Sequence, residues 1–145
     1  MAILLLLGGV VGTGKSTIAS LLTKHGFVHL DWDKITPAEK LIGMVKEHLS
    51  GGENIVVSEW FHPDYQNVEK LLKNIDTSRI VIKFVRLTAS LETCLRRKPS
   101  IDDIIRQNFK REQTSQDEYP WIKIFNNEDD DQDKIAERIL ALCKG

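Results

Sequence analysis

The sequence is poor in cysteine, in proline and in long apolar runs. It holds two cysteines, Cys94 and Cys143, which are far apart and not in metal-ligand spacing, and four prolines. So little cysteine argues against a disulfide scaffold or a cysteine-ligated metal site, and both residues stand among apolar residues at helical spacing. We therefore expect two small core residues, in a protein of a reducing compartment.

The sequence also has no excess of positive or negative charge and no stretch that suits a membrane. Twenty Lys and Arg residues against 21 Asp and Glu residues give a formal net charge of −1, so there is no overall basic field to attract nucleic acid. The first residues lack the basic stretch of a signal peptide, and the apolar run at residues 3–7 is too short to span a bilayer. We expect a cytoplasmic protein that makes no membrane contact.

Strand and helix patterns alternate along all 145 residues. Continuous or β-branched apolar runs predict five strands, at residues 3–7, 27–31, 55–57, 80–87 and 122–125. Apolar residues at helical spacing predict helices between them, including residues 15–25 and a helix opened by the capping box Thr36-Pro37-Ala38-Glu39. The alternation predicts one α/β domain over residues 1–145, with a three-layer α/β/α fold around a five-stranded, mainly parallel sheet.

The stretch GGVVGTGKST follows the first predicted strand and opens the first predicted helix. Its residues 9–16 match G-x-x-x-x-G-K-[ST] at every fixed position, in the setting that a phosphate-binding loop requires. Glycines let backbone N–H groups converge on phosphate oxygens, and the helix start adds unpaired donors and a positive dipole end. We expect Lys15 to reach the β- and γ-phosphates, Ser16 to bind Mg²⁺ and Thr17 to touch the α-phosphate.

On these residues the chain resembles the P-loop NTPases, which implies a nucleoside triphosphate, expected to be ATP with Mg²⁺. The predicted nucleotide-binding residues of the loop are Gly9, Gly12, Thr13, Gly14, Lys15, Ser16 and Thr17. A glycine-rich turn with an incidental lysine is the alternative. The GTPase pattern is not matched, because no aspartate has glycine three residues on and Asn126-Asn127-Glu128-Asp129 lacks the lysine of Asn-Lys-x-Asp. The apolar run 55–57 leads into Ser58-Glu59, and not into the Asp-Glu of larger ATPases.

Asp31-Trp32-Asp33 stands at the end of the second predicted strand. Strand periodicity puts both aspartates on one face, and this end of an open α/β sheet faces the ligand crevice. Shikimate kinases carry a similar Asp-x-Asp after a similar loop and helix. The resemblance implies a small kinase in which Asp33 orients or deprotonates the acceptor hydroxyl and Asp31 supports Mg²⁺ through water. An Asx-type turn with two solvated acids is the alternative.

Basic residues follow the fourth predicted strand, at Arg96 and Arg97. In nucleotide-kinase-like folds a helix at this place ends in arginines that begin a lid and neutralise the transferring phosphate. The resemblance implies that role for both arginines, although basic residues also favour any helix C-terminus. It further implies that the loop at Asn126 contacts adenine, and that the sheet is ordered 2-3-1-4-5.

Glu59 and Trp60 follow the third predicted strand, where the substrate signatures of related kinases are absent. The sequence has neither the Gly-Gly-Gly loop of shikimate kinases nor the Asp-Gly-x-Pro-Arg of adenylate-type kinases at this place. We expect Asp33, Glu59 and Trp60 to contact a small acceptor, with packing under the third helix as the alternative for Trp60. A nucleotide-binding module without kinase activity and a nucleic-acid end kinase are the alternative functions. The patterns predict no oligomeric state.

Overall fold

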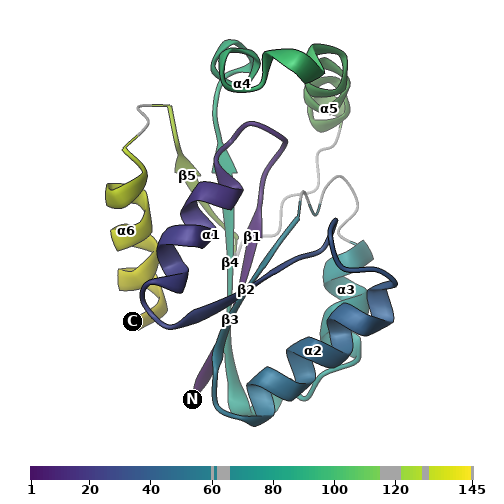
Figure 1. The fold of residues 1–145 in the computed structure, drawn as a ribbon, viewed down its shortest axis with the longest axis vertical. Helices are drawn as coiled ribbons and strands as arrows, with labels where there is room; N and C mark the ends of the chain where they lie inside the picture. The colour runs from purple at the N-terminus through teal and green to yellow at the C-terminus, as the bar shows by residue number, and fades with distance from the viewer. Residues whose placement is uncertain (60, 62–65, 115–121, 129–130, 145) are drawn as a thin grey trace.

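The computed structural model describes residues 1–59, 61, 66–114, 122–128 and 131–144 (Figure 1). The strands are β1 (Ala2–Gly8), β2 (Phe27–Asp31), β3 (Asn54–Ser58), β4 (Ile80–Thr88) and β5 (Ile122–Asn126). The α-helices are α1 (Lys15–Thr23), α2 (Ala38–Ser50), α3 (Gln66–Lys73), α4 (Leu91–Arg97), α5 (Asp102–Thr114) and α6 (Gln132–Lys144). Short 3₁₀ turns at Thr77–Arg79 and Pro99–Ile101 precede β4 and α5.

The five strands form one sheet in the order β2-β3-β1-β4-β5. Each neighbouring pair is parallel, with Leu6 opposite both Val57 of β3 and Phe84 of β4. The expected strand order is therefore confirmed. Because all strands run the same way, their carboxyl ends lie at one edge of the sheet, where ligands bind in open α/β folds.

The central strand β1 is buried on both faces. Leu4 and Leu6 belong to an apolar core shared with residues of α2 and α3, whereas Leu5 and Leu7 belong to a second core shared with α1 and α6. Figure 1 shows these helix pairs on opposite sides of the sheet, which makes the three layers of the α/β/α fold. A continuous run of leucine suits this position because neither face of the strand meets water.

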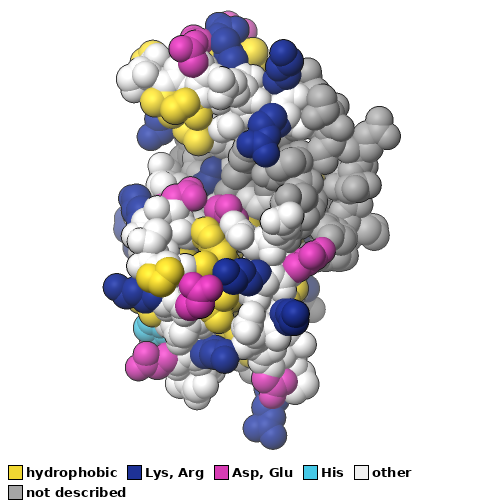
Figure 2. Space-filling view, turned by 90° about the vertical axis from the view of Figure 1, so that its right-hand side faces the viewer, with side chains coloured by type: hydrophobic (Ala, Val, Ile, Leu, Met, Phe, Trp, Pro, Cys, Tyr) yellow, Lys and Arg dark blue, Asp and Glu magenta, His cyan; other side chains and the backbone are white. Residues whose placement is uncertain are grey.

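Helices α4 and α5 stand above the carboxyl end of the sheet, beyond the turn from β1 to α1 (Figure 1). A third apolar cluster of Val10, Cys94 and Ile105 joins them to the loop after β1. The view onto α2 and α3 shows acidic and basic side chains interspersed (Figure 2), in keeping with the near-zero net charge. Within the described segments, no helix has the length and apolarity that crossing a membrane requires.

Two local expectations can be compared with the structure. Cys94 and Cys143 are buried and carry free thiols, which confirms that they are core residues. The prediction of a capping box at Thr36 is wrong. Helix α2 begins at Ala38 with Pro37 as its N-cap, and no side chain caps it. Pro37 is extended, at φ −71° and ψ 171°, and its carbonyl already accepts from the backbone N–H of Lys40. Thr36 thus lies one residue too early to cap the helix.

Burial of β1 leads to a prediction about stability. We expect Leu6→Ala to lower the free energy of unfolding by about 2–5 kcal/mol, because it removes a fully buried side chain and leaves a cavity. Ile104→Ala is the control, since Ile104 on α5 is 50% exposed and its change should stay within about 0.5 kcal/mol. Urea denaturation of both variants measures the difference, and equal losses would contradict this account of the core.

Candidate functional site

Five of the seven predicted loop residues line a cavity of about 510 Å³ at the carboxyl end of the sheet. Three groups of side chains meet there, from the loop and α1, from the ends of β2 and β3, and from the end of α4 and the start of α6. The lining residues are Val11, Gly12, Gly14, Lys15, Ser16, Thr17, Asp31, Asp33, Ser58, Arg97, Lys98 and Gln132. Segments more than 100 residues apart in the chain thus form one site.

Lys15 lies at the first turn of α1 with its ammonium group turned back onto the loop. Its Nζ donates to the carbonyl oxygens of Gly9 and Val10, the latter at 3.1 Å. Burial lowers the pKa of Lys15 to about 8, against the opposing pull of Asp33, Asp31 and Glu59. A buried ammonium that is only partly compensated by carboxylates favours a further anion beside it.

Two loop glycines are required by close neighbours as well as by their backbone angles. Gly14 has a φ of +97°, and a Cβ atom there would lie 2.5 Å from Nδ2 of Asn127. Gly12 has a φ of +93°, and a Cβ atom there would lie 2.9 Å from Cβ of Cys94 on α4. The loop is therefore packed between α4 and the segment after β5, and larger residues would push these neighbours away.

Asn127 holds the loop from the β5 side. The residue is 1% exposed, and its Nδ2 donates to the backbone carbonyl of Thr13 at 2.8 Å and to Oε1 of Gln132 at 2.9 Å. Its Oδ1 is buried and has no hydrogen-bond partner among the described residues. The hydroxyl of Thr13 donates to the carbonyl of Val10 at 2.8 Å, so this side chain braces the loop from within.

Arg97 joins the loop to the segment after β5. Its guanidinium donates to the carbonyl oxygens of Gly12 at 3.1 Å and Asn127 at 2.5 Å. The neighbouring Glu128 accepts from the hydroxyl of Thr93 at 2.5 Å and from the backbone N–H of Ser90, which lie at the start of α4. These hydrogen bonds, Thr93 foremost, hold the pKa of Glu128 below its usual range. Helix α4 is thereby tied to two loops of the site.

Asp31 and Asp33 both face the cavity from the end of β2. Oδ1 of Asp31 accepts from the backbone N–H of Asp33 at 3.0 Å, which is the hydrogen bond of an Asx turn. The two residues of this turn also line the cavity. Desolvation and the neighbouring Asp31 raise the pKa of Asp33, while Lys15 lowers it. A carboxyl group with a raised pKa beside a phosphate-binding loop suits proton transfer from a hydroxyl.

Ser58 ends β3 where larger ATPases carry aspartate. Its hydroxyl lines the cavity and lies 2.7 Å from Nε2 of His29 on β2. Burial lowers the pKa of His29, against an opposing influence of Asp31. His29 thus acts as a packed hydrogen-bond partner, as a partly buried strand histidine ordinarily does.

Glu59 lies behind the cavity wall. Its Oε1 accepts from Nδ2 of Asn67 at 2.8 Å, and its buried Oε2 has no hydrogen-bond partner among the described residues. Burial raises the pKa of Glu59 to about 6, partly offset by the hydrogen bond from Asn67. The next described residue, Phe61, has a positive φ of 59° and packs edge-on against Trp32 and Phe84.

The oxygen donors of the site fit a magnesium ion held mainly by phosphates and water. Ser16 offers an exposed hydroxyl and Asp31 a carboxylate, and both line the same cavity. In the described part of the chain, no group of three or more His, Cys, Asp or Glu side chains could hold a metal. Such a sparse set suits Mg²⁺, which keeps several waters and binds through one or two protein oxygens plus substrate phosphates.

The structure separates the expected site residues into two groups. Gly12, Gly14, Lys15, Ser16, Thr17, Asp31, Asp33 and Arg97 line the cavity, whereas Gly9, Thr13, Glu59, Arg96 and Asn126 do not. Asn126 is exposed and its Oδ1 accepts from the backbone N–H of Glu128, whereas the neighbouring Asn127 packs against the phosphate-binding loop. Trp60 lies outside the described residues.

Outside the glycine-rich loop, three cavity-lining residues were missed from the sequence, namely Ser58, Lys98 and Gln132, and so was the supporting Asn127. Strand alternation is the signal for Asn127. Phe125 packs into the core beneath α1 and α6, and two residues later Asn127 falls on the same face, beside the loop. Lys98 and Gln132 carry no comparable local signal.

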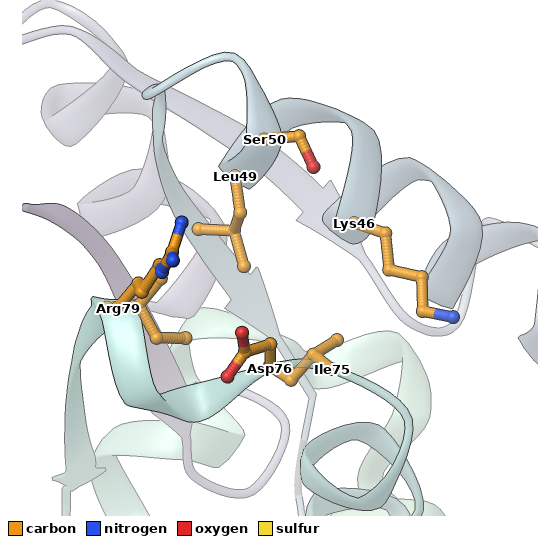
Figure 3. A pocket seen from close by; sticks show the side chains of 7 residues that line it. Lys46, Leu49, Ser50, Ile75, Asp76 and Arg79 are labelled. Carbon is orange, nitrogen blue, oxygen red and sulfur yellow. The ribbon is translucent and has the colours of Figure 1, made fainter.

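A second cavity, of about 560 Å³, lies at the opposite end of the sheet (Figure 3). Side chains from the end of α2 and from residues 75–80 face each other across it. It combines apolar Leu49, Ile75 and Ile80 with Lys46, Asp76 and Arg79 and has no glycine-rich loop. Its size is similar, but the chemistry for phosphate binding lies at the first cavity.

No family model matches the chain, and no curated protein matches it either. A gluconokinase from Sinorhizobium meliloti 1021 superposes with a TM-score of 0.68 and 17% identity, over 97% of this chain and 93% of that one. A thymidylate kinase from Candida albicans gives 0.63 and 17%, over 99% and 91%. The Pnkp1/Rnl/Hen1 RNA repair complex gives 0.65 and 15%, over 83% of this chain and 47% of that one. The chain thus has the fold of the small P-loop kinases.

The contact between Gly14 and Asn127 leads to a second prediction. We expect Gly14→Ala to lower the free energy of unfolding by more than the roughly 1–2 kcal/mol that a left-handed backbone angle costs alone, because its Cβ meets Asn127. Gly52→Ala is the matched control, since Gly52 has a φ of +78° and nothing within 4 Å of its Cβ position. Thermal unfolding of both variants measures the excess, and equal losses would mean that Asn127 does not press on the loop.

Proposed function

We propose that this protein is an ATP- and Mg²⁺-dependent kinase that transfers the γ-phosphate to a hydroxyl group of a small acceptor. One observation carries the proposal. Lys15, Ser16 and Asp33, each expected for a different part of phosphoryl transfer, line a single cavity at the mouth of a phosphate-binding loop. The fold that this chain shares with small P-loop kinases supports the same assignment.

The two ends of the cavity differ in chemistry, and this orients the nucleotide. Asp31, Asp33 and Ser58 lie at one end, and Arg97, Lys98 and Gln132 at the other, with the loop between them. Asp33 is the largest carboxylate influence on the pKa of Lys15, which supports a γ-phosphate oriented toward the acidic end. The nucleoside then occupies the end formed by α4 and α6.

In the proposed reaction, the acceptor oxygen attacks the γ-phosphorus while the bond to the β–γ bridging oxygen breaks and ADP leaves. The acceptor proton passes to the carboxylate of Asp33. Lys15 neutralises charge on the β- and γ-phosphates, and Arg97 and Lys98, at the end of α4, add positive charge beside the phosphates. Ser16, and Asp31 through water, would hold Mg²⁺, which would supply charge neutralisation at the phosphates. Gly9 and Thr13 contribute by shaping the loop, and Glu59 follows β3 on the side proposed for the acceptor.

The acceptor class is open to a direct experiment. A panel of sugars, sugar acids, nucleosides, nucleoside monophosphates and RNA with a 5′-hydroxyl end covers the chemistry named for the structural neighbours. Acceptor-dependent release of ADP supports a kinase and identifies the class. ATP binding with no acceptor-dependent turnover would instead support a nucleotide-binding module without kinase activity.

Asp33 provides the third prediction. We expect Asp33→Asn to lower transfer by about 100-fold or more, because the amide cannot take the hydroxyl proton. Mg–ATP affinity, measured by calorimetry, should stay within about threefold of the wild type, since Asp33 faces the acceptor and not the nucleoside. Glu39→Gln on the exposed face of α2 serves as a charge-matched control with full activity. Undiminished transfer by Asp33→Asn would remove Asp33 from the reaction.

Lys15 provides the fourth prediction, on pH. Its pKa of about 8 in the free protein means that the ammonium form, which a bound triphosphate stabilises, is fully present below pH 8 and lost above it. We expect Mg–ATP affinity to be level below that pH and to fall by up to roughly tenfold per pH unit above it. Calorimetry across this range measures the slope, with proton uptake on binding. Lys15→Arg should bind with little pH dependence, because arginine stays charged; an equally steep slope would assign the effect to another group.

A further inference from the structure

Gln132 is the first residue of α6 and carries a side-chain amide. It lines the cavity together with Arg97 and Lys98, at the end assigned above to the nucleoside. Its Oε1 lies 3.1 Å and its Nε2 3.7 Å from the Cβ position of Gly14, so the amide group sits directly beside the loop. No motif predicts this residue, and the reaction proposed above does not use it.

The orientation of this amide follows from a chain of hydrogen bonds that begins at the backbone. The carbonyl of Thr13 can only accept, so the group of Asn127 that lies 2.8 Å from it must be the NH₂ group. The same Nδ2 lies 2.9 Å from Gln132, which must therefore present its oxygen to Asn127. Because Asn127 is 1% exposed and packed against Gly14, it cannot turn over without losing both bonds.

The consequence is that the other half of the Gln132 amide, its NH₂ group, is left for a ligand. Asn127 is the only hydrogen-bond partner of the Gln132 side chain among the described residues. The backbone of the phosphate-binding loop thus sets the polarity of a side chain at the end of the cavity assigned above to the nucleoside. A donor in this position suits a ring nitrogen or a carbonyl oxygen, which every nucleobase carries.

We propose that Gln132 recognises the nucleobase by donating a hydrogen bond from Nε2 to an acceptor atom of the base, in an orientation imposed by Asn127 and Thr13. The inference rests on the proposed nucleotide site, and it adds a specificity-determining residue to that site. Asn127 is a positioning residue in the same account, because it acts through Gln132 and through the loop.

The test separates the base from the phosphates by comparing Mg–ATP with magnesium tripolyphosphate, which has no base, in calorimetric titrations of the full chain. Gln132→Glu keeps an oxygen for Asn127 and replaces the outward NH₂ group by a second oxygen. We expect its affinity for ATP to fall about tenfold further than its affinity for tripolyphosphate, as the loss of one hydrogen bond plus acceptor repulsion implies. Gln107→Glu, the same charge change on the exposed face of α5, should leave both affinities unaltered.

Two further variants complete the test. Asn127→Asp cannot donate to Thr13 or to Gln132, and it would draw the NH₂ group of Gln132 toward its own carboxylate, so it should weaken both ligands and weaken ATP further than tripolyphosphate. Gln132→Met, which keeps the length of the side chain without its polar group, should reproduce the selective loss for ATP by about threefold to tenfold and stands in if Gln132→Glu unfolds. Equal losses of both ligands in the Gln132 variants, or a wild type that binds ATP no better than tripolyphosphate, would overturn the inference. A wild type that binds neither ligand would instead overturn the proposed nucleotide site.

Discussion

Burial of β1 on both faces is the constraint on which the site depends. The strand lies between β3 and β4 and under two helical layers, with Leu4 to Leu7 fully buried. Since every strand is parallel, the chain must leave β1 at the carboxyl edge and return along one face as α1. The glycine-rich loop makes that turn, so the strand that is most firmly fixed in the core also fixes the position of the loop.

The polarity of the loop follows from how its carbonyl groups are paired. Lys15 donates to the carbonyl oxygens of Gly9 and Val10. Arg97 donates to the carbonyl oxygen of Gly12, and Asn127 donates to that of Thr13. With these acceptors occupied by the protein's own cations and amides, the loop and the first turn of α1 offer donors to the cavity. Donors that converge on one point, beside an ammonium group with a lowered pKa, select an anion.

Features encoded by neighbouring residues could be predicted from the sequence, and features made by distant residues could not. The apolar run of β1 and the spacing of Gly9, Gly14 and Lys15 are local, so the loop was located correctly and the resemblance it carries led to the right strand order. The role of Asn127 was missed because whether its side chain faces the loop depends on how β5 is paired, 114 residues from Thr13. Gln132 is positioned only through Asn127, and the cap at Thr36 failed because Pro37 takes the N-cap position itself.

The contacts around the loop divide the molecule into two halves with different constraints. On the half proposed for the nucleotide, Cys94, Arg97 and Glu128 hold α4 against the loop and the segment after β5. On the half proposed for the acceptor, Asp33 and Glu59 follow the ends of β2 and β3, whose apolar residues belong to the core beneath α2 and α3. The halves meet mainly through β1 and β3. Residues on the acceptor side can therefore change without moving the loop, which is how one phosphate-binding frame can serve kinases with different acceptors.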